Sequence, residues 1–324
     1  MKDSWIKKGF VDEPVDSNVN LVDGIRRLVK EKNAVILAHY YQEAEIQDIA
    51  DFVGDSLDLS RKAAETEAEI IVFAGVHFMA ETAKILSPQK KVFIPDQMAG
   101  CSLADSCPPA EFEVFRKEHP DHMVVTYVNT SAAIKALSDV CCTSTNALQI
   151  IQHIPANQKI IFAPDRNLGN YLNSLTGRDM LLWDGACHVH EEFSLEKILL
   201  LKNEYPEAKI IAHPECQGPI RVVADFIGST SALLNFSSSD PTMTYIVATE
   251  SGILHQMKKA NPDKLFIPAP PKDSTCACND CKFMKLHNLR KIYNTLKYEW
   301  PDVTVPEEIR VLAEVPIRRM LEWS

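Results

Sequence analysis

The sequence has no long apolar run and no excess of basic residues, and its cysteines are odd in number. No stretch approaches the roughly 20 apolar residues that cross a membrane, and the first residues hold no apolar core of signal-peptide length. Lys and Arg number 34 against 44 Asp and Glu, so the formal net charge is −10. We therefore expect a cytoplasmic protein that binds neither a membrane nor nucleic acid, although a locally positive site can still hold a small anion.

The nine cysteines are the unusual part of the composition. Their odd number argues against a complete disulfide framework, and cytoplasmic cysteines are usually reduced, metal-bound or catalytic. We interpret four of them as packed structural residues: Cys107, Cys141, Cys142 and Cys216. The chain is 46% hydrophobic, which is ample for a core, and its length predicts one large domain or two to three smaller ones.

Short β-branched runs alternate with helical patterns along the chain. Nine of these runs predict strands, at residues 34–40, 70–75, 91–96, 123–129, 159–165, 180–185, 209–215, 244–250 and 264–270. The start near Leu21–Glu31 and most of the last forty residues read as helices. This alternation predicts an α/β fold with mainly parallel sheets.

The nine strands fall into three groups of three, and equivalent positions recur 88 and then 86 residues apart. Three sets of residues keep these spacings: His39, Tyr127 and His213; Asp51, Asp139 and Asp225; Ser56, Ser144 and Thr230. The repeat predicts three homologous αβα (Rossmann-like) domains, at residues 1–118, 119–204 and 205–324. We expect them to pack in a pseudo-threefold arrangement around a central site.

Cysteines follow the third strand of each group. Cys101 and Cys187 lie 86 residues apart, and the third group offers Cys276, Cys278 and Cys281. Ligands bind at the C-terminal ends of parallel strands, so three equivalent cysteines would meet at one point. Three thiolates suit a zinc ion with an open fourth position, or a 4Fe–4S cluster whose fourth iron has no protein thiolate.

Polar residues gather at the same strand ends. His39, Tyr127 and His213 would face the axis, and Tyr41 shares a face with His39 because side chains alternate along an extended segment. Glu215 is the one carboxylate there and suits a general acid or base. The hydroxyls of the third set precede helical patterns, where such residues are usually N-caps, and converging helix N-termini can also bind an anion.

The longer motifs resemble the quinolinate synthase family over nearly the whole chain. They are AHYYQ at 38–42, GDSLDLS at 54–60, PDQMAGCSLADSC at 95–107, YVNTSAAIKA at 127–136, CTSTNA at 142–147, WDGACHVH at 183–190, HPEC at 213–216 and GSTSAL at 228–233. The resemblance implies a transferase that condenses iminosuccinate with dihydroxyacetone phosphate to give quinolinate, phosphate and water in NAD biosynthesis. An L-aspartate-oxidising enzyme would supply the imine, with transient contact.

The resemblance also implies a site. A 4Fe–4S cluster would be held by Cys101, Cys187 and Cys281. Substrate contacts would come from His39, Ser56, Tyr127, Asn129, Ser144, His190, His213, Glu215 and Thr230. Glu215, with Tyr41 and His213, would move protons, and closure of the domains would exclude water.

Two other readings stay open at this point. A cluster with an open iron also suits a hydro-lyase acting on a hydroxy acid, which an assay with citrate-like acids would reveal. A zinc-stabilised scaffold is the non-enzymatic alternative, and metal analysis would identify it. Structural zinc sites usually pair cysteines that are close in sequence, unlike the widely spaced cysteines here.

Overall fold

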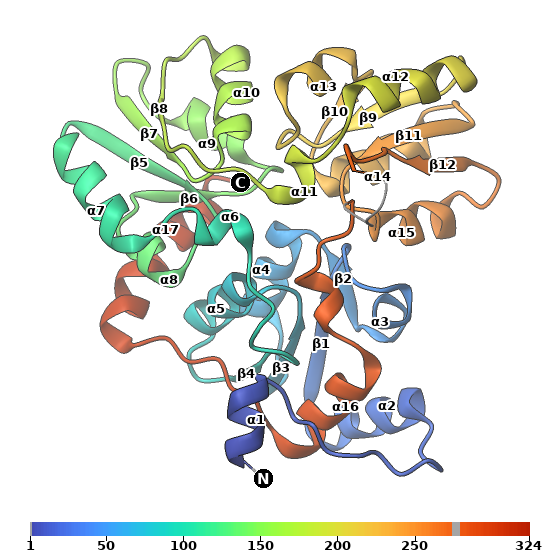
Figure 1. Cartoon of the computed structure of the whole chain (residues 1–324). Helices are drawn as coiled ribbons and strands as arrows, with labels where there is room; N and C mark the ends of the chain where they lie inside the picture. Colours follow the sequence, from blue (N-terminus) through green and yellow to red (C-terminus); the bar gives the residue numbers. More distant parts are fainter. Residues whose placement is uncertain (1, 274–278) are drawn as a thin grey trace.

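Three four-stranded parallel sheets with one shared strand order form the frame of this computed structural model (Figure 1), which describes residues 2–273 and 279–324. The strands of the first sheet are β1 (Ala34–His39), β2 (Phe52–Gly54), β3 (Ile70–Ala74) and β4 (Lys91–Phe93). Those of the second are β5 (His122–Tyr127), β6 (Val140–Cys142), β7 (Lys159–Ala163) and β8 (Leu181–Leu182). The third contains β9 (Lys209–Ala212), β10 (Phe226–Ile227), β11 (Thr244–Ala248) and β12 (Leu265–Pro268).

The shared order is second, first, third, fourth, which places β1, β5 and β9 at equivalent inner positions. The pairing register repeats as well. Leu37, Val125 and Ile211 hold equivalent positions, and each pairs with the first residue of the neighbouring edge strand. The predicted α/β fold with three Rossmann-like αβα units is therefore confirmed. We call the parts around the three sheets units I, II and III.

Helices cover both faces of the sheets. In and before unit I they are α1 (Lys2–Lys8), α2 (Leu21–Glu31), α3 (Ala44–Ile49), α4 (Ser56–Glu65), α5 (His77–Leu86) and α6 (Ser102–Asp105). The next are α7 (Pro109–Glu118), α8 (Ala132–Ala136), α9 (Ala147–His153), α10 (Arg166–Thr176), α11 (His188–Glu191) and α12 (Leu195–Glu204). The last are α13 (Gly218–Val223), α14 (Thr230–Ser239), α15 (Ile253–Ala260), the 3₁₀ turn η1 (Met284–Leu286), α16 (Leu289–Tyr298) and α17 (Glu307–Glu322). In the described residues, none of the helices is long and apolar enough to cross a membrane.

The nine-strand prediction was incomplete. All nine predicted runs contain a strand, but β2, β6 and β10 were missed. These three edge strands are two or three residues long, which is too short for a periodic pattern to reveal. Cys141 and Cys142 lie on β6 and are fully buried, so they are packed residues within a strand.

The repeated aspartates anchor these edge strands. Each precedes its edge strand and accepts a hydrogen bond from a backbone N–H of the neighbouring first strand. The pairs are Asp51 with Ile36 at 2.7 Å, Asp139 with Val124 at 2.7 Å and Asp225 with Ile210 at 2.8 Å. The Asp positions are therefore structural, and the carboxylate starts the pairing that a two- or three-residue strand continues.

A repeated basic residue, not recognised in the sequence, closes a helix in each unit with the same spacing. Lys90, Arg178 and Lys264 donate to the C-cap carbonyls of α4, α9 and α14, which belong to Thr66, Ile154 and Asp240. A cation at a helix C-terminus satisfies carbonyls without an intrahelical partner and opposes the helix dipole. The 88- and 86-residue spacing would have identified this set.

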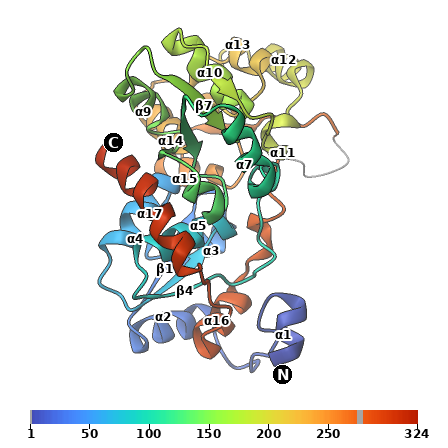
Figure 2. The same ribbon diagram turned by 90° about the vertical axis from the view of Figure 1, so that its left-hand side faces the viewer.

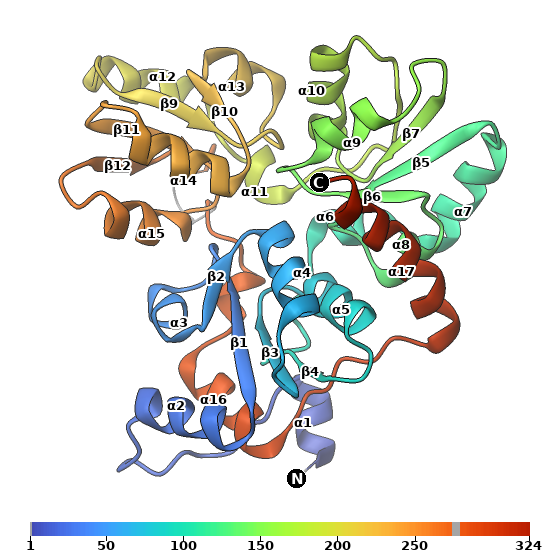
Figure 3. The same ribbon diagram turned by 180° about the vertical axis from the view of Figure 1, so that it is seen from behind.

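The units share helices across their boundaries. The equivalent helices α2, α7 and α12 precede the first strands, and α7 packs on α8 while α12 packs on β11. The predicted boundary after residue 118 lies between α7 and the second sheet, and the boundary after residue 204 lies between α12 and the third sheet. The division into three domains at these residues stays a prediction. Figures 2 and 3 show α17 running along unit II, where it contacts α8 and β6. Helix α16 returns to unit I and packs on α2.

One hydrophobic cluster joins units I and II beside the threefold centre. It contains Phe73 and Phe78 of unit I, Val125 and Phe162 of unit II, and Met284 from η1. Cys101, Cys187 and Cys281 pack against its edge. This cluster therefore packs strands of units I and II against each other and against η1, beside the three cysteines.

Candidate active site

The strands β1, β5 and β9 end at one central cavity. His39 and Tyr127 are the last residues of β1 and β5, and His213 follows β9 directly. Every predicted site residue lines this cavity: His39, Tyr41, Ser56, Cys101, Tyr127, Asn129, Ser144, Cys187, His190, His213, Glu215, Thr230 and Cys281. Its open space is about 60 Å³, enough for a few water molecules. Ligand pockets usually measure about 300–1,000 Å³, so the open space here is smaller than that of a typical metabolite site.

Glu215 lies at the centre of the polar network and is almost fully buried. The Tyr127 hydroxyl donates to its Oε1 at 2.5 Å, and His213 Nδ1 lies 3.6 Å from the same oxygen. His190 Nδ1 lies 3.2 Å from Oε2, but among the described residues neither atom has an aligned hydrogen-bond partner. Burial raises the pKa of Glu215, and the two histidines with the tyrosine hydroxyl outweigh it, lowering the pKa to about 2. The carboxylate is therefore ionised at neutral pH.

Tyr41 reaches from unit I into unit III. Its hydroxyl hydrogen-bonds with Thr230 Oγ1 at 2.9 Å and with Thr249 Oγ1 at 2.8 Å. Thr249 Oγ1 also lies 3.1 Å from His190 Nε2. Burial raises the pKa of Tyr41 well above its usual value, so the phenol keeps its proton. A chain of proton-carrying groups thus runs from Tyr41 through Thr249 to His190, beside Glu215.

The strand-end histidines are neutral. Burial lowers the pKa of His39 to about 4 and that of His213 to about 3. His213 Nε2 pairs with the Ser144 hydroxyl at 3.2 Å, which joins unit III to unit II. Asn129 Oδ1 is buried and has no hydrogen-bond partner among the described residues. A buried acceptor of this kind suits a ligand that donates hydrogen bonds.

The repeated hydroxyls are not N-caps, which corrects one of the two roles expected for them. Ser56 and Thr230 are the first residues of α4 and α14, and the capping side chains are those of the preceding residues, Asp55 and Ser229. Ser144 lies in the turn before α9, and Thr143 before it accepts from the Thr145 N–H at 3.3 Å. None of the three repeated hydroxyls is therefore used as a helix cap, and all three line the cavity.

Cys101, Cys187 and Cys281 come from different parts of the fold. Cys101 precedes α6 and Cys187 precedes α11, whereas Cys281 lies just before η1. All three are free thiols. Burial raises their pKa values, that of Cys101 to about 12. Cys276 and Cys278 lie outside the described residues.

A tighter donor group includes only one of these cysteines. Cys187, His190 and Glu215 have ligand atoms within 4.8 Å of one another, and this is the single such group found in the described residues. Cys101 and Cys281 are not members of this group. Cys107 and Cys216 are buried and do not line the cavity, and Cys216 Sγ donates to the Ala248 carbonyl at 3.2 Å.

Three polar cavity residues were not predicted from the sequence: Asp55, Thr143 and Glu250. Asp55 and Thr143 each lie one position before a predicted hydroxyl, and Glu250 follows β11 together with Thr249, which contacts Tyr41 and His190. Glu250 accepts from the Cys281 N–H at 3.1 Å and the Gly252 N–H at 2.7 Å, and Lys285 Nζ lies 3.2 Å away. The signal for Thr249 and Glu250 was their place at the end of a predicted strand, where ligands bind.

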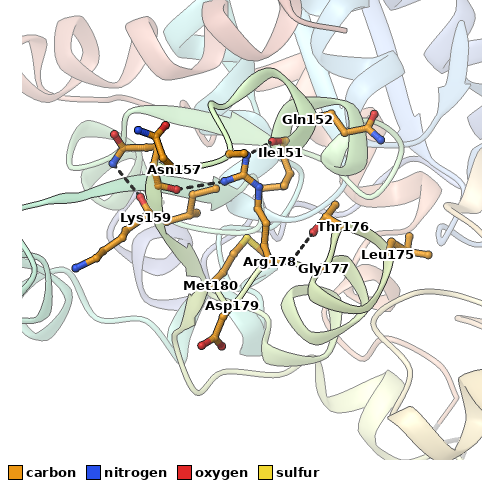
Figure 4. Close-up of a pocket in the computed structure, with 13 residues that line it drawn as sticks. Ile151, Gln152, Asn157, Lys159, Leu175, Thr176, Gly177, Arg178, Asp179 and Met180 are labelled. Atoms are coloured by element: carbon orange, nitrogen blue, oxygen red, sulfur yellow. Dashed lines mark hydrogen bonds between the residues drawn. The ribbon is translucent and has the colours of Figure 1, made fainter.

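A larger hollow lies at the opposite end of the second sheet and has a structural explanation (Figure 4). It measures about 570 Å³ and surrounds Arg178. The guanidinium donates to the carbonyls of Ile151, Ile154, Pro155 and Gln158. A similar hollow surrounds Lys90 in unit I. Since the basic residue is occupied by helix carbonyls in both, these hollows belong to the repeated frame.

Comparison with known proteins agrees with the geometry. A family model described as "Quinolinate synthetase A protein" matches residues 23–322. The chain is 58% identical over 314 residues to a protein named quinolinate synthase from a Synechococcus species, covering 97% of this chain and 98% of the relative. Proteins of the same name from a Nostoc species and from Chloroherpeton thalassium are 59% identical over 312 residues and 56% over 313. Those alignments cover 96% of this chain, and 96% and 97% of the relatives.

Proposed function

The chain belongs to the quinolinate synthase family, and we propose that it condenses iminosuccinate with dihydroxyacetone phosphate to give quinolinate, phosphate and water. Membership makes it an enzyme of NAD biosynthesis, and formation of the new bonds would class it as a transferase. One observation carries the proposal. The thirteen residues expected to hold cofactor and substrates come from three units and line one cavity.

We propose that Cys101, Cys187 and Cys281 hold a 4Fe–4S cluster. A tetrahedral zinc ion has Zn–S bonds of about 2.3 Å, which would hold the sulfurs roughly 3.8 Å apart. Neither Cys101 nor Cys281 belongs to the close donor group around Cys187, and a cluster would give each of the three cysteines a separate iron. When bound, the cluster supplies an iron without a protein thiolate, which acts as a Lewis acid toward the substrate.

The substrates are anions, and the cavity has donors suited to them. Ser56 and Thr230 stand at the N-termini of the ten-residue helices α4 and α14, where free N–H groups and the helix dipole favour carboxylate or phosphate. The neutral imidazoles of His39 and His213 add further hydrogen-bonding groups. Asn129 offers a buried acceptor for a substrate hydroxyl or imine N–H.

Proton transfer is assigned to Glu215, Tyr41 and His213. Ionised Glu215 accepts a proton from substrate carbon or nitrogen, and the Tyr127 hydroxyl holds the carboxylate in place. Tyr41 is protonated before the reaction and donates its phenolic proton to a leaving oxygen. A proton then returns to Tyr41 from His190 through the Thr249 hydroxyl. Closure of the three units around a cavity of about 60 Å³ excludes water from these steps.

The first test is an anaerobic assay with both substrates, beside a count of iron and acid-labile sulfide in wild type and Cys281→Ser. We expect about four of each per chain in the wild type, quinolinate as product, and loss of both in the variant. Zinc without sulfide would overturn the cluster, and turnover of citrate-like acids without quinolinate would overturn the substrates. A cytoplasmic location and delivery of the imine by an L-aspartate-oxidising enzyme stay predictions.

A further inference from the structure

Asp55 contacts all three units with one carboxylate. Its Oδ1 accepts the backbone N–H groups of Leu57 at 3.0 Å and Asp58 at 3.1 Å, both in its own helix α4. Its Oδ2 accepts the Thr145 hydroxyl of unit II and the Ser231 hydroxyl of unit III, each at 2.6 Å. The carboxylate is almost fully buried, and its four near acceptor positions are occupied by protein donors.

The internal repeat shows that this arrangement is asymmetric. Asp55 is equivalent to Thr143 and Ser229. The Ser229 hydroxyl caps α14, and the Thr143 hydroxyl accepts from the Thr145 N–H in the turn before α9, so both equivalents are neutral. Thr145 and Ser231 are equivalent to Leu57, which is buried and apolar. Unit I therefore carries the acceptor and units II and III carry the donors. Capping alone does not require this difference, because a hydroxyl is sufficient in unit III.

The position following each cap is a cavity hydroxyl. Asp55 precedes Ser56, Thr143 precedes Ser144, and Ser229 precedes Thr230. Thr145 and Ser231 directly follow Ser144 and Thr230 in the chain, so their hydrogen bonds to Asp55 limit the separation of the three cavity hydroxyls. Movement of unit II or III away from unit I would break the bond from Thr145 or Ser231 to Asp55.

We propose that Asp55 is a positioning residue that clamps the three units and sets the spacing of Ser56, Ser144 and Thr230. The inference rests on the proposed function, in which these hydroxyls hold the anionic substrates. Asp55 acts through the hydroxyls and does not contact substrate, since its oxygens are already paired. Opening the closed cavity requires its two inter-unit hydrogen bonds to break.

Two variants remove the clamp from opposite sides. Asp55→Ser retains a capping hydroxyl, as in unit III, but loses the carboxylate acceptor. The double variant Thr145→Val with Ser231→Ala retains the Asp55 cap and loses both donors. Asp48→Asn is the matched control, because exposed Asp48 also pairs with unit III, through His255 and Lys259 at 3.0 Å. Exposed pairs of this kind contribute little.

Hydrogen–deuterium exchange of the iron-loaded protein is the first measurement. We expect faster exchange in peptides covering residues 143–147 and 229–233 in both clamp variants, with no change in Asp48→Asn. Combining all three substitutions should add nothing, because both sides remove the same contacts. Unchanged exchange in Asp55→Ser, or effects that add in the combined variant, would overturn the clamp. If Asp55→Ser does not fold, the double variant decides alone.

Kinetics separate the clamp from a direct role. We expect kcat/KM for quinolinate formation to fall about tenfold in both clamp variants, since charge-assisted hydrogen bonds are lost, with unchanged iron content. A loss of activity in Asp55→Ser without a loss in the double variant would overturn the inference and assign Asp55 to the substrate. If the wild type itself forms no quinolinate, the proposed function fails, and the exchange result still decides whether Asp55 clamps the units.

Discussion

Gly252→Ala should push the Tyr41 segment out of the site, because Gly252 of unit III touches the backbone of unit I. A Cβ at Gly252 would lie 2.8 Å from both Cα and the carbonyl carbon of Tyr41, and 2.9 Å from Glu250 Oε2. Carbon atoms pack at about 3.5 Å or more, so the two segments must separate by about 0.7 Å. The hydrogen bonds from the Tyr41 hydroxyl to Thr230 and Thr249 now measure 2.9 and 2.8 Å, and they would then exceed the usual O–H···O limit of about 3.0 Å.

The expected cost is about 1–3 kcal/mol of unfolding free energy, as for other overpacked contacts, together with lower kcat because Tyr41 is displaced. Urea unfolding and quinolinate assays measure the two effects. Gly218→Ala is the control: it lies in the same unit, and its nearest neighbour to an added Cβ is Arg221 Nη2 at 4.0 Å. Wild-type stability and turnover in Gly252→Ala, indistinguishable from Gly218→Ala, would refute the close approach of units I and III.

Three further predictions address other parts of the molecule. Glu215→Gln should retain the iron and lower kcat by about 10²-fold or more, whereas near-normal turnover would remove Glu215 from proton transfer. Arg178→Met should lower the unfolding free energy by about 1–2 kcal/mol with unchanged KM, because Arg178 bonds to the Ile151 and Ile154 carbonyls at the end of α9 and does not line the cavity; a raised KM would contradict that assignment. Burial lowers the pKa of His39 and of His287 to about 4, so the unfolded chain binds these protons first. Stability should be complete above about pH 6.5 and fall toward pH 4, by up to about 1.4 kcal/mol per pH unit for each histidine. Urea midpoints at pH 7, 6 and 5 test this, and a flat profile would contradict it.

The sequence predicted those parts of the fold that repeat. The 88- and 86-residue spacing identified the strand-end residues His39, Tyr127 and His213, because the first strand of each unit pairs with its edge strand in the same register. The strand end also explains why Glu215 could be singled out. Edge strands of two or three residues were missed, because their stability comes from one neighbouring strand and an aspartate, not from a pattern of their own.

Contacts between units could not be read from spacing. Nothing in the local sequence of Thr145 or Ser231 indicates that both donate to Asp55, since the three residues are brought together by the packing of separate sheets. Similarly, the helical pattern of the last forty residues predicted α17 but not its position on α8 of unit II. Long-range partners depend on the whole fold, which a short window does not contain.

The triplication separates the frame from the site in a further way. Frame positions carry the same chemistry in each unit, as Asp51, Asp139 and Asp225 do, because each unit must begin an edge strand identically. Site positions diverge, because one substrate lacks threefold symmetry and needs different groups on its different sides. The strand ends accordingly carry His, Tyr and His, and the caps carry Asp, Thr and Ser. The three proposed cluster ligands are all cysteines, although Cys101, Cys187 and Cys281 do not keep the 88- and 86-residue spacing of the repeat. Divergence at equivalent positions near the axis is thus a sign of function, and Asp55 meets that condition although its role is to hold the units together.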